Sequence, residues 1–162
     1  MYTLRVGVKV VVEHYYSKKP STKYYKTLIS DVIRGVPVEF YVAPGVFSKG
    51  KVDYGTRLLI EVAVLPDTGT VLDVGAGYGV IGITIAKLNP KLRVYMVEIN
   101  RRAYELCLQN IKLNDVEDRV TVLLGDLYEP VKNLKFDMII SNPPYSAGMY
   151  IVEKLIVESK NY

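Results

Sequence analysis

The chain has 162 residues, of which 49% are hydrophobic and 23% are charged, as in one globular domain that buries a sizeable core. Its only cysteine is Cys107 and its only histidine is His14, which excludes an internal disulfide and a Cys- or His-rich metal site and argues against a Ser-His-Asp triad. No apolar run approaches the roughly 20 residues of a membrane-spanning helix, and the N-terminus lacks a signal-peptide layout, so we expect a cytoplasmic protein.

The formal net charge of +4 is distributed unevenly. Residues 1–60 contain ten Lys or Arg and four Asp or Glu, whereas residues 61–162 contain eleven and thirteen. A basic segment beside a mildly acidic body favours a polyanionic partner, and nucleic acid is the first candidate. The alternative is that the lysines only keep a surface solvated, and charge alone does not decide between the two.

The N-terminal third has a β-rich pattern. Apolar and polar residues alternate as in half-buried strands over two segments, 4–14 and 36–42, and Arg34-Gly35 is typical of a hairpin turn. We therefore expect a small basic, β-rich extension over residues 1–52 that packs onto the rest of the chain within a single structural domain.

From residue 53 onward, strand and helix patterns alternate. A helix opened by Asp53 is predicted over 53–65, and further helices over 79–88 and 101–114. Strands are predicted over 70–75, 93–99, 119–125 and 136–141. This order predicts an α/β fold, Rossmann-like and doubly wound, with a mainly parallel sheet in the body 53–162.

The glycine-rich stretch LDVGAGYGVIG (72–82) follows a predicted strand and opens a helix. Glycines let the backbone approach a ligand closely, and free N–H groups at the helix start face it. The glycine spacing also satisfies the dinucleotide fingerprint, which by itself is a weak match. Asp73 stands just before Gly75-x-Gly77-x-Gly79, and a carboxylate there disfavours a pyrophosphate but suits a cation. S-adenosylmethionine (SAM) carries an ammonium and a sulfonium and no phosphate, so the pattern favours SAM over NAD.

Two more carboxylates end the next strands. Glu98 follows the second strand, where a carboxylate can take both ribose hydroxyls, as in NAD and SAM sites alike. Asp126 follows the third strand, where it could accept the adenine amino group. Taken singly, Asp73 could be a helix cap, and Glu98 and Asp126 could be turn residues. Their order at successive strand ends favours a SAM site.

The last predicted strand runs into Asn142-Pro143-Pro144-Tyr145. An exocyclic amino group on a base is a poor nucleophile because its lone pair is delocalised into the ring. The Asn142 side-chain oxygen and the Pro143 carbonyl could accept its two N–H groups and turn the lone pair toward a methyl donor, while the prolines stiffen the loop. Tyr145 could stack on the base. The alternative is a rigid turn with Tyr145 in the core, but ligands bind at such strand ends in open α/β sheets.

The segment HYYSKKPSTKYYK (14–26) interleaves four tyrosines with four lysines. Lysines contact phosphates and tyrosines stack on unpaired bases, a pattern typical of single-stranded or looped RNA binding. The candidate RNA contacts are Lys18, Lys19, Lys23, Lys26, Tyr24 and Tyr25. The alternative is a solvated loop whose tyrosines pack under the hairpin.

The ordered motifs LDVGAGYGVIG, VEIN, GDLY and NPPY resemble those of class I SAM-dependent methyltransferases. More narrowly, segments 14–25 and 44–61 are similar to the small-domain (MTS) methyltransferases related to the ribosomal small-subunit RNA guanine-N2 enzymes. The pair Gly45-Val46-Phe47-Ser48 and Asp53-x-Gly55-Thr56 is specific to that group, whereas NPPY is shared with adenine-N6 and glutamine methyltransferases. The resemblance covers residues 14–160.

The resemblance implies a SAM-dependent N-methyltransferase that acts on guanine N2 of RNA, with S-adenosyl-L-homocysteine as product, and it implies that Phe47 and Ser48 cover the cofactor. The predicted cofactor contacts are Phe47, Ser48, Asp73, Gly75, Ala76, Gly77, Gly79, Glu98, Ile99, Asp126, Leu127 and Asn142. Adenine N6 in RNA or DNA, a protein glutamine, and a non-catalytic RNA-binding module stay as alternatives.

The family fold continues past NPPY with further strands, whereas one helix-like segment, 151–162, follows here. We therefore expect the last strand to lie at an open sheet edge, which a second copy or a partner would cover.

Overall fold

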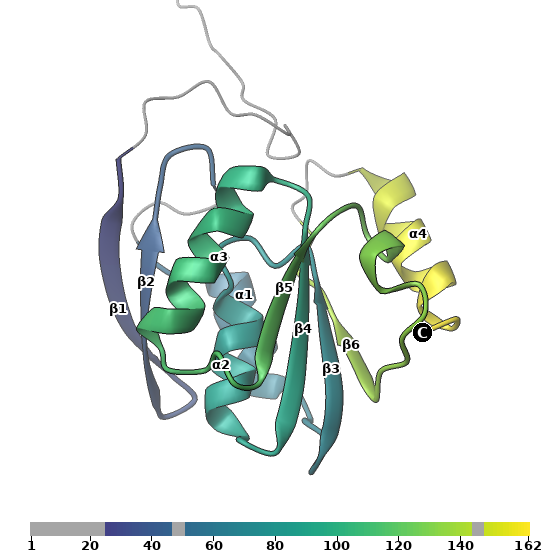
Figure 1. Ribbon diagram of the computed structural model, residues 1–162, viewed down its shortest axis with the longest axis horizontal. Coiled ribbons are helices and arrows are strands. Elements are labelled where there is room, and N and C mark those ends of the chain that lie inside the picture. The colour runs from purple at the N-terminus through teal and green to yellow at the C-terminus, as the bar shows by residue number, and fades with distance from the viewer. Residues whose placement is uncertain (1–24, 47–50, 144–147) are drawn as a thin grey trace, which may run out of the picture.

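The computed structural model describes residues 25–46, 51–143 and 148–162, and it contains a hairpin and a four-stranded parallel sheet (Figure 1). The strands are β1 (Thr27–Ile33), β2 (Val36–Val42), β3 (Gly69–Val74), β4 (Leu92–Glu98), β5 (Val120–Leu124) and β6 (Met138–Ile140). The helices are α1 (Tyr54–Val62), α2 (Val80–Leu88), α3 (Arg101–Leu113), the 3₁₀ turn η1 (Glu129–Val131) and α4 (Met149–Ser159).

The hairpin turn at Arg34-Gly35 is confirmed: β1 and β2 pair antiparallel around it, and both turn residues have positive φ, 49° and 80°. Two such residues in succession suit the tight turns that match the twist of a hairpin. The strand before the turn is β1, to which the sequence pattern assigned no structure. The predicted strand 4–14 lies outside the described residues.

The far edge of β2 is joined to α3 by two asparagine side chains. The Asn110 carboxamide accepts from the Tyr41 N–H over 2.7 Å and donates to the Tyr41 carbonyl over 3.1 Å. One helical turn later, Asn114 accepts from the Glu39 N–H over 3.2 Å and donates to the Glu39 carbonyl over 2.7 Å. These carboxamides act as a short substitute strand, and they tie the hairpin to the body of the molecule.

The parallel sheet has the strand order β5-β4-β3-β6, which confirms the predicted α/β fold. β3 lies in the interior of the sheet, in register with β4 on one side and β6 on the other, so that Asp73 pairs with both Met96 and Ile140. The carboxyl ends of these three strands therefore meet at one edge of the sheet. β6 is shorter than predicted, and α1 ends at Val62 because the chain becomes extended at Ala63.

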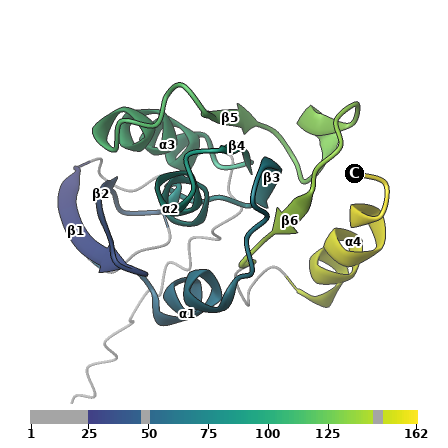
Figure 2. The same ribbon diagram turned by 90° about the horizontal axis from the view of Figure 1, so that it is seen from below.

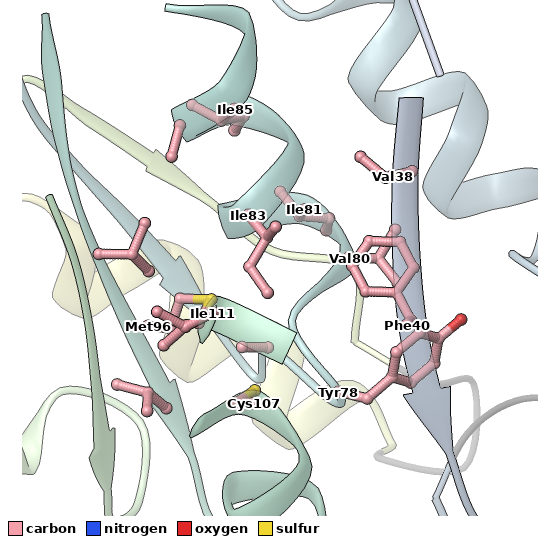
Figure 3. Packing of buried hydrophobic residues seen from close by; sticks show 14 of the residues in the cluster. Val38, Phe40, Tyr78, Val80, Ile81, Ile83, Ile85, Met96, Cys107 and Ile111 are labelled. Carbon is pink, nitrogen blue, oxygen red and sulfur yellow. The ribbon is translucent and has the colours of Figure 1, made fainter. Parts of the chain in front are cut away.

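Both faces of the sheet are covered, as the doubly wound prediction required. On one face α2, α3 and the hairpin enclose a core that contains Phe40, Ile83 and Met96, with the Phe40 and Tyr78 rings edge to face at 5.6 Å (Figure 3). The other face is covered by α4 (Figure 2). Leu155 of α4 belongs to a second buried cluster with Leu72 and Tyr128. Side chains alternate along β3, so Val71 and Asp73 face α2 while Leu72 and Val74 face α4.

In the described part of the chain, β6 has a strand neighbour on one side only, as expected. The helices on either side of β6 also leave large apolar side chains exposed, namely Tyr54, Leu58 and Val62 on α1 and Met149, Tyr150, Ile156 and Val157 on α4. Among the described helices, none combines the length and apolar character that crossing a bilayer would demand.

Candidate active site

The turn between β3 and α2 is tied down on its inner side and open on its outer side. The N–H groups of Gly75 and Ala76 both donate to the Val97 carbonyl, over 2.9 and 3.1 Å. Gly75 has φ of 76°, and a Cβ built on it would meet no atom of the described residues within 4 Å. At Gly79, with φ of 99°, a Cβ would lie 2.8 Å from Ile83 Cδ1. Gly75 therefore presents open backbone to a ligand, whereas Gly79 is a packing position.

Asp73 lies beneath this turn and is fully buried. Its Oδ2 accepts from the Gly82 N–H over 3.0 Å, while Oδ1 has no hydrogen-bond partner among the described residues. Burial raises the pKa of Asp73 to about 7 against the opposing Gly82 hydrogen bond, and the nearby Glu98 adds to the rise. A buried acceptor without a partner is costly. Asp73 lines neither of the hollows described below, so a cationic ligand there would interact with it through its charge and not by direct contact.

Glu98 is also buried beneath the turn and lines neither of the hollows described below. Its Oε2 accepts from the Gly77 N–H and its Oε1 from the Asn100 N–H, each over 2.7 Å. Burial raises the pKa of Glu98 to about 7 in spite of these bonds. A carboxylate has about four acceptor positions, so two stay open, and the contact of Glu98 with a ribose stays a prediction.

Two hollows meet at Gly75. The first is lined by Asp53, Thr56, Gly75, Ala76, Gly77, Tyr78, Val80, Ile81 and Asn142. The second is lined by Val74, Gly75, Val97, Ile99, Gly125, Asp126, Leu127, Ser141, Pro143, Ile151 and Leu155. Most of the predicted cofactor residues in the described segments thus line one or the other of these two hollows on either side of Gly75. An elongated ligand with a polar end near Asn142 and an apolar ring near Ile99 and Leu127 suits this shape.

Asn142 and Pro143 follow β6 directly, at the carboxyl edge of the sheet. The Ser141 hydroxyl donates to the Val74 carbonyl over 2.7 Å, which joins the end of β6 to the end of β3. The Asn142 Nδ2 donates to Thr56 Oγ1 over 2.8 Å and lies 3.4 Å from Asp53 Oδ2. The sequence predicted Asp53 as the cap of α1, which is confirmed.

Sequence reasoning missed two supports of the site. Thr56 appeared only within the family motif Asp53-x-Gly55-Thr56, and that motif was the signal that could have placed it near NPPY. The Cys107 thiol is buried in α3 among the core residues (Figure 3). It donates to the Gly77 carbonyl over 3.1 Å and so supports the turn. Nothing in the local pattern of α3 indicates that contact.

Several predicted residues lie outside the described segments, namely Lys18, Lys19, Lys23, Tyr24, Phe47, Ser48, Pro144 and Tyr145. Of the proposed RNA contacts, Tyr25 is 62% exposed. The Lys26 ammonium donates to Gln109 Oε1 over 2.7 Å and lies 5.0 Å from the centre of the Tyr41 ring. Within the described segments, no group of three or more His, Cys, Asp or Glu side chains is arranged to hold a metal ion.

Residues 37–162 match the model of the family described as "Methyltransferase small domain" (MTS). The protein YbxB of Bacillus subtilis is 38% identical over 152 residues, which are 93% of this chain and 75% of YbxB. The ribosomal RNA small subunit methyltransferase C of Aeromonas hydrophila is 42% identical over 107 residues, 65% of this chain and 30% of that enzyme. The release factor glutamine methyltransferase of Aquifex aeolicus is 43% identical over 94 residues, 56% of this chain and 34% of that enzyme.

Among solved structures, the T. thermophilus 16S rRNA N2 G1207 methyltransferase, in complex with AdoMet and guanosine, matches with a TM-score of 0.72 and 26% identity. The match covers 87% of this chain and 40% of that enzyme. The chain thus spans three quarters of YbxB but less than half of the named enzymes. The family match, the YbxB relative and the shared fold together lead to one conclusion: the chain belongs to the methyltransferase small domain family and has a class I methyltransferase fold that is shorter than the full one.

Proposed function

We propose that this chain is a SAM-dependent methyltransferase that acts on an exocyclic amino group of a nucleic-acid base, guanine N2 of ribosomal RNA. One observation carries the proposal. The side chain of Asn142 lines the same hollow as the open turn at Gly75, while Pro143 lines the neighbouring hollow with Asp126. Two acceptors suited to an amine thus stand next to the place where a cofactor would lie.

The residues present suit SAM. The open outer side of Gly75 gives room for its chain, and the unpartnered Oδ1 of Asp73 adds negative potential where the cationic end would lie. Ile99 and Leu127 would hold the adenine, with Asp126 facing its amino group. When bound, SAM supplies a methyl group on a positively charged sulfur, and S-adenosyl-L-homocysteine is the product.

The chain's own part in the reaction is to hold the amine. The Asn142 Oδ1 and the Pro143 carbonyl would accept the two N–H groups of the substrate, which reduces delocalisation of the nitrogen lone pair into the ring. Pro143 fixes one backbone dihedral, so the acceptors are oriented before the substrate arrives. A strong general base is not needed because the nitrogen becomes acidic once it is methylated. The proposed stacking of Tyr145 on the base stays a prediction.

Guanine in ribosomal RNA is favoured by what the similar proteins do. The T. thermophilus enzyme, whose match covers 87% of this chain, is a 16S rRNA N2 methyltransferase solved with guanosine. The relative named for glutamine methylation matches 56% of the chain. The basic segment 14–26 also suits RNA better than a release factor.

The test is to incubate the chain with tritiated SAM and, separately, unmodified small-subunit rRNA, adenine-containing DNA and a glutamine-containing release-factor peptide. We expect label in N2-methylguanosine after nucleoside analysis of the rRNA. Label in N6-methyladenosine or in the peptide would replace the guanine proposal. Calorimetric SAM binding without label in any acceptor would instead indicate a non-catalytic RNA-binding module.

A further inference from the structure

A short chain of hydrogen bonds links the start of α1 to the amide at the end of β6. Asp53 caps α1, with Oδ1 accepting from the Gly55 N–H over 2.9 Å and Oδ2 accepting from the Thr56 N–H over 3.0 Å. The Thr56 hydroxyl donates to the same Oδ2. Thr56 Oγ1 in turn accepts from Asn142 Nδ2 over 2.8 Å, across a sequence separation of 86 residues.

The ionisation state of Asp53 determines which group donates and which accepts in each of these hydrogen bonds. Hydrogen bonds from the Thr56 hydroxyl and from the Thr56 and Gly55 N–H groups outweigh the opposite effect of burial and lower the pKa of Asp53, so it is an ionised, acceptor-only group. The Thr56 hydroxyl must therefore give its single proton to Asp53. Its oxygen is left with lone pairs only, and it can bind Asn142 only through the amide NH₂.

The orientation of the Asn142 amide follows from this. A carboxamide has two nearly isosteric orientations, and turning it over would set its oxygen against the Thr56 lone pairs. Asp53, Thr56 and Asn142 all line the hollow that Gly75 opens into. With its nitrogen bound at Thr56, Asn142 has an oxygen that accepts no hydrogen bond from the described residues and is available to a donor from a substrate.

We infer that Asp53 and Thr56 are positioning residues, which lock the Asn142 carboxamide with its oxygen presented to the substrate amine. This inference rests on the proposed function, and it extends that function to α1, an element that makes none of the proposed contacts with the amine. Thr56 is 9% exposed, so solvent competes little for its hydroxyl. The lock is built before any substrate binds, which is the form of preorganisation that lowers a barrier without an added cost during the reaction.

Thr56→Val is the direct test because it keeps the shape of the side chain and removes the hydroxyl. One hydrogen bond that orients a reacting group corresponds to a loss in kcat of about tenfold. We expect that loss with the KM for rRNA and the Kd for SAM changed by less than about threefold. Thr56→Ser, which restores a hydroxyl, should recover most of the rate. Thr84→Val is the matched control, since Thr84 is buried in α2 and its hydroxyl has no partner among the described residues.

The double variant Thr56→Val with Asn142→Ala distinguishes two roles of Thr56. It can act by orienting Asn142, or it can contact the substrate or cofactor directly. If Thr56 acts only through Asn142, adding Thr56→Val to Asn142→Ala should leave the remaining rate unchanged. A further tenfold loss in the double variant, or a SAM affinity that falls in step with kcat, would overturn the inference.

A measurement without turnover keeps the inference distinct from the proposed function. In ¹⁵N-labelled protein, the side-chain NH₂ of Asn142, assigned by its absence in Asn142→Ala, should be slow to exchange with solvent. Thr56→Val should make that exchange at least about tenfold faster, and Thr84→Val should not. If the wild type methylates no amine, the proposed function fails, but this exchange result still decides the orientation. Equal exchange in the wild type and Thr56→Val would overturn it.

Discussion

The main-chain N–H of Gly77 donates to Oε2 of Glu98 over 2.7 Å, which joins the glycine turn to the last residue of β4. Glu98 and Asp73 are both buried beneath that turn, and burial raises the pKa of each carboxyl to about 7 from ordinary values of 4.5 and 3.8. At a pH between the ordinary pKa values and about 7, these carboxyls are protonated in the folded state and ionised in the unfolded chain. The free energy of unfolding should therefore be largest below about pH 4 as far as these groups are concerned, and this contribution is lost as the pH rises through about 7.

Binding of a cation should have the opposite pH dependence to folding stability, because a cation favours the ionised form of these carboxyls. SAM affinity should rise between about pH 5.5 and pH 8, with protons released on binding. Calorimetry in two buffers of different ionisation enthalpy measures both quantities. Asp73→Asn should flatten the profile. An affinity that is constant over this range in the wild type would show that the carboxyls do not sense the ligand.

Gly75 and Gly79 offer a matched pair of substitutions. Both have positive φ, so each alanine variant carries roughly 1–2 kcal/mol of backbone strain. Gly75→Ala should lower SAM affinity at least about tenfold, since its methyl group occupies the open side of the turn. Gly79→Ala should lose more stability, because its methyl group meets Ile83 and Cys107. Thermal unfolding and calorimetry separate the two effects, and equal affinity losses would argue that strain alone is responsible.

Asn142→Ala removes the proposed side-chain acceptor and leaves the glycine turn unchanged. We expect SAM binding to stay within about threefold of the wild type while methyl transfer falls at least about a hundredfold. Calorimetry and the tritium-transfer assay give the two numbers. Comparable losses in both would remove Asn142 from the chemistry.

The lysines of segment 14–26 are proposed to contact RNA phosphates. Changing Lys18, Lys19 and Lys23 to Glu should weaken RNA affinity and make its dependence on salt less steep. Lys26→Glu is best tested separately, because Lys26 already contacts Gln109 and Tyr41 and its loss also loosens the hairpin. An affinity that does not change across a salt titration would restore the reading of a solvated loop.

Within the described segments, β6 has one strand edge without a neighbour, and α1 and α4 leave apolar side chains exposed, which together predict self-association of this chain. Light scattering at micromolar concentration should give a mass of at least a dimer. Ile156→Lys on α4 should shift the population toward the monomer if that helix takes part, with the exposed Lys160→Ala as a control. A well-folded monomer of the wild type would contradict the prediction.

The body of the fold could be predicted from the sequence because its signals are local. The strand β3 is buried over its last four residues and is apolar there except for Asp73, and α1 begins after the recognisable cap residue Asp53. β1 was missed for the opposite reason. Only Ile29 and Ile33 are buried along it, and Ser30 and Asp31 interrupt the pattern, so pairing with β2 fixes the strand.

The candidate site, too, could be predicted from the sequence only in part. The glycine turn, Asp126 and Asn142 could be found because each follows a recognisable strand. The burial of Glu98 beneath the turn and the contact between Thr56 and Asn142 could not, since both depend on segments that only the tertiary structure brings together.

The carboxamides of Asn110 and Asn114 have a consequence for how copies of this molecule can associate. A bare strand edge is a template on which another chain can add a strand and propagate a fibril. On the side of β2 that faces α3, the N–H and C=O groups of Glu39 and Tyr41 are already bonded to the two side chains, so that edge is not available for such growth. Replacing both asparagines with leucine would leave these four main-chain groups without their side-chain partners, so that wherever α3 moves away from β2 a strand of a second copy could pair there.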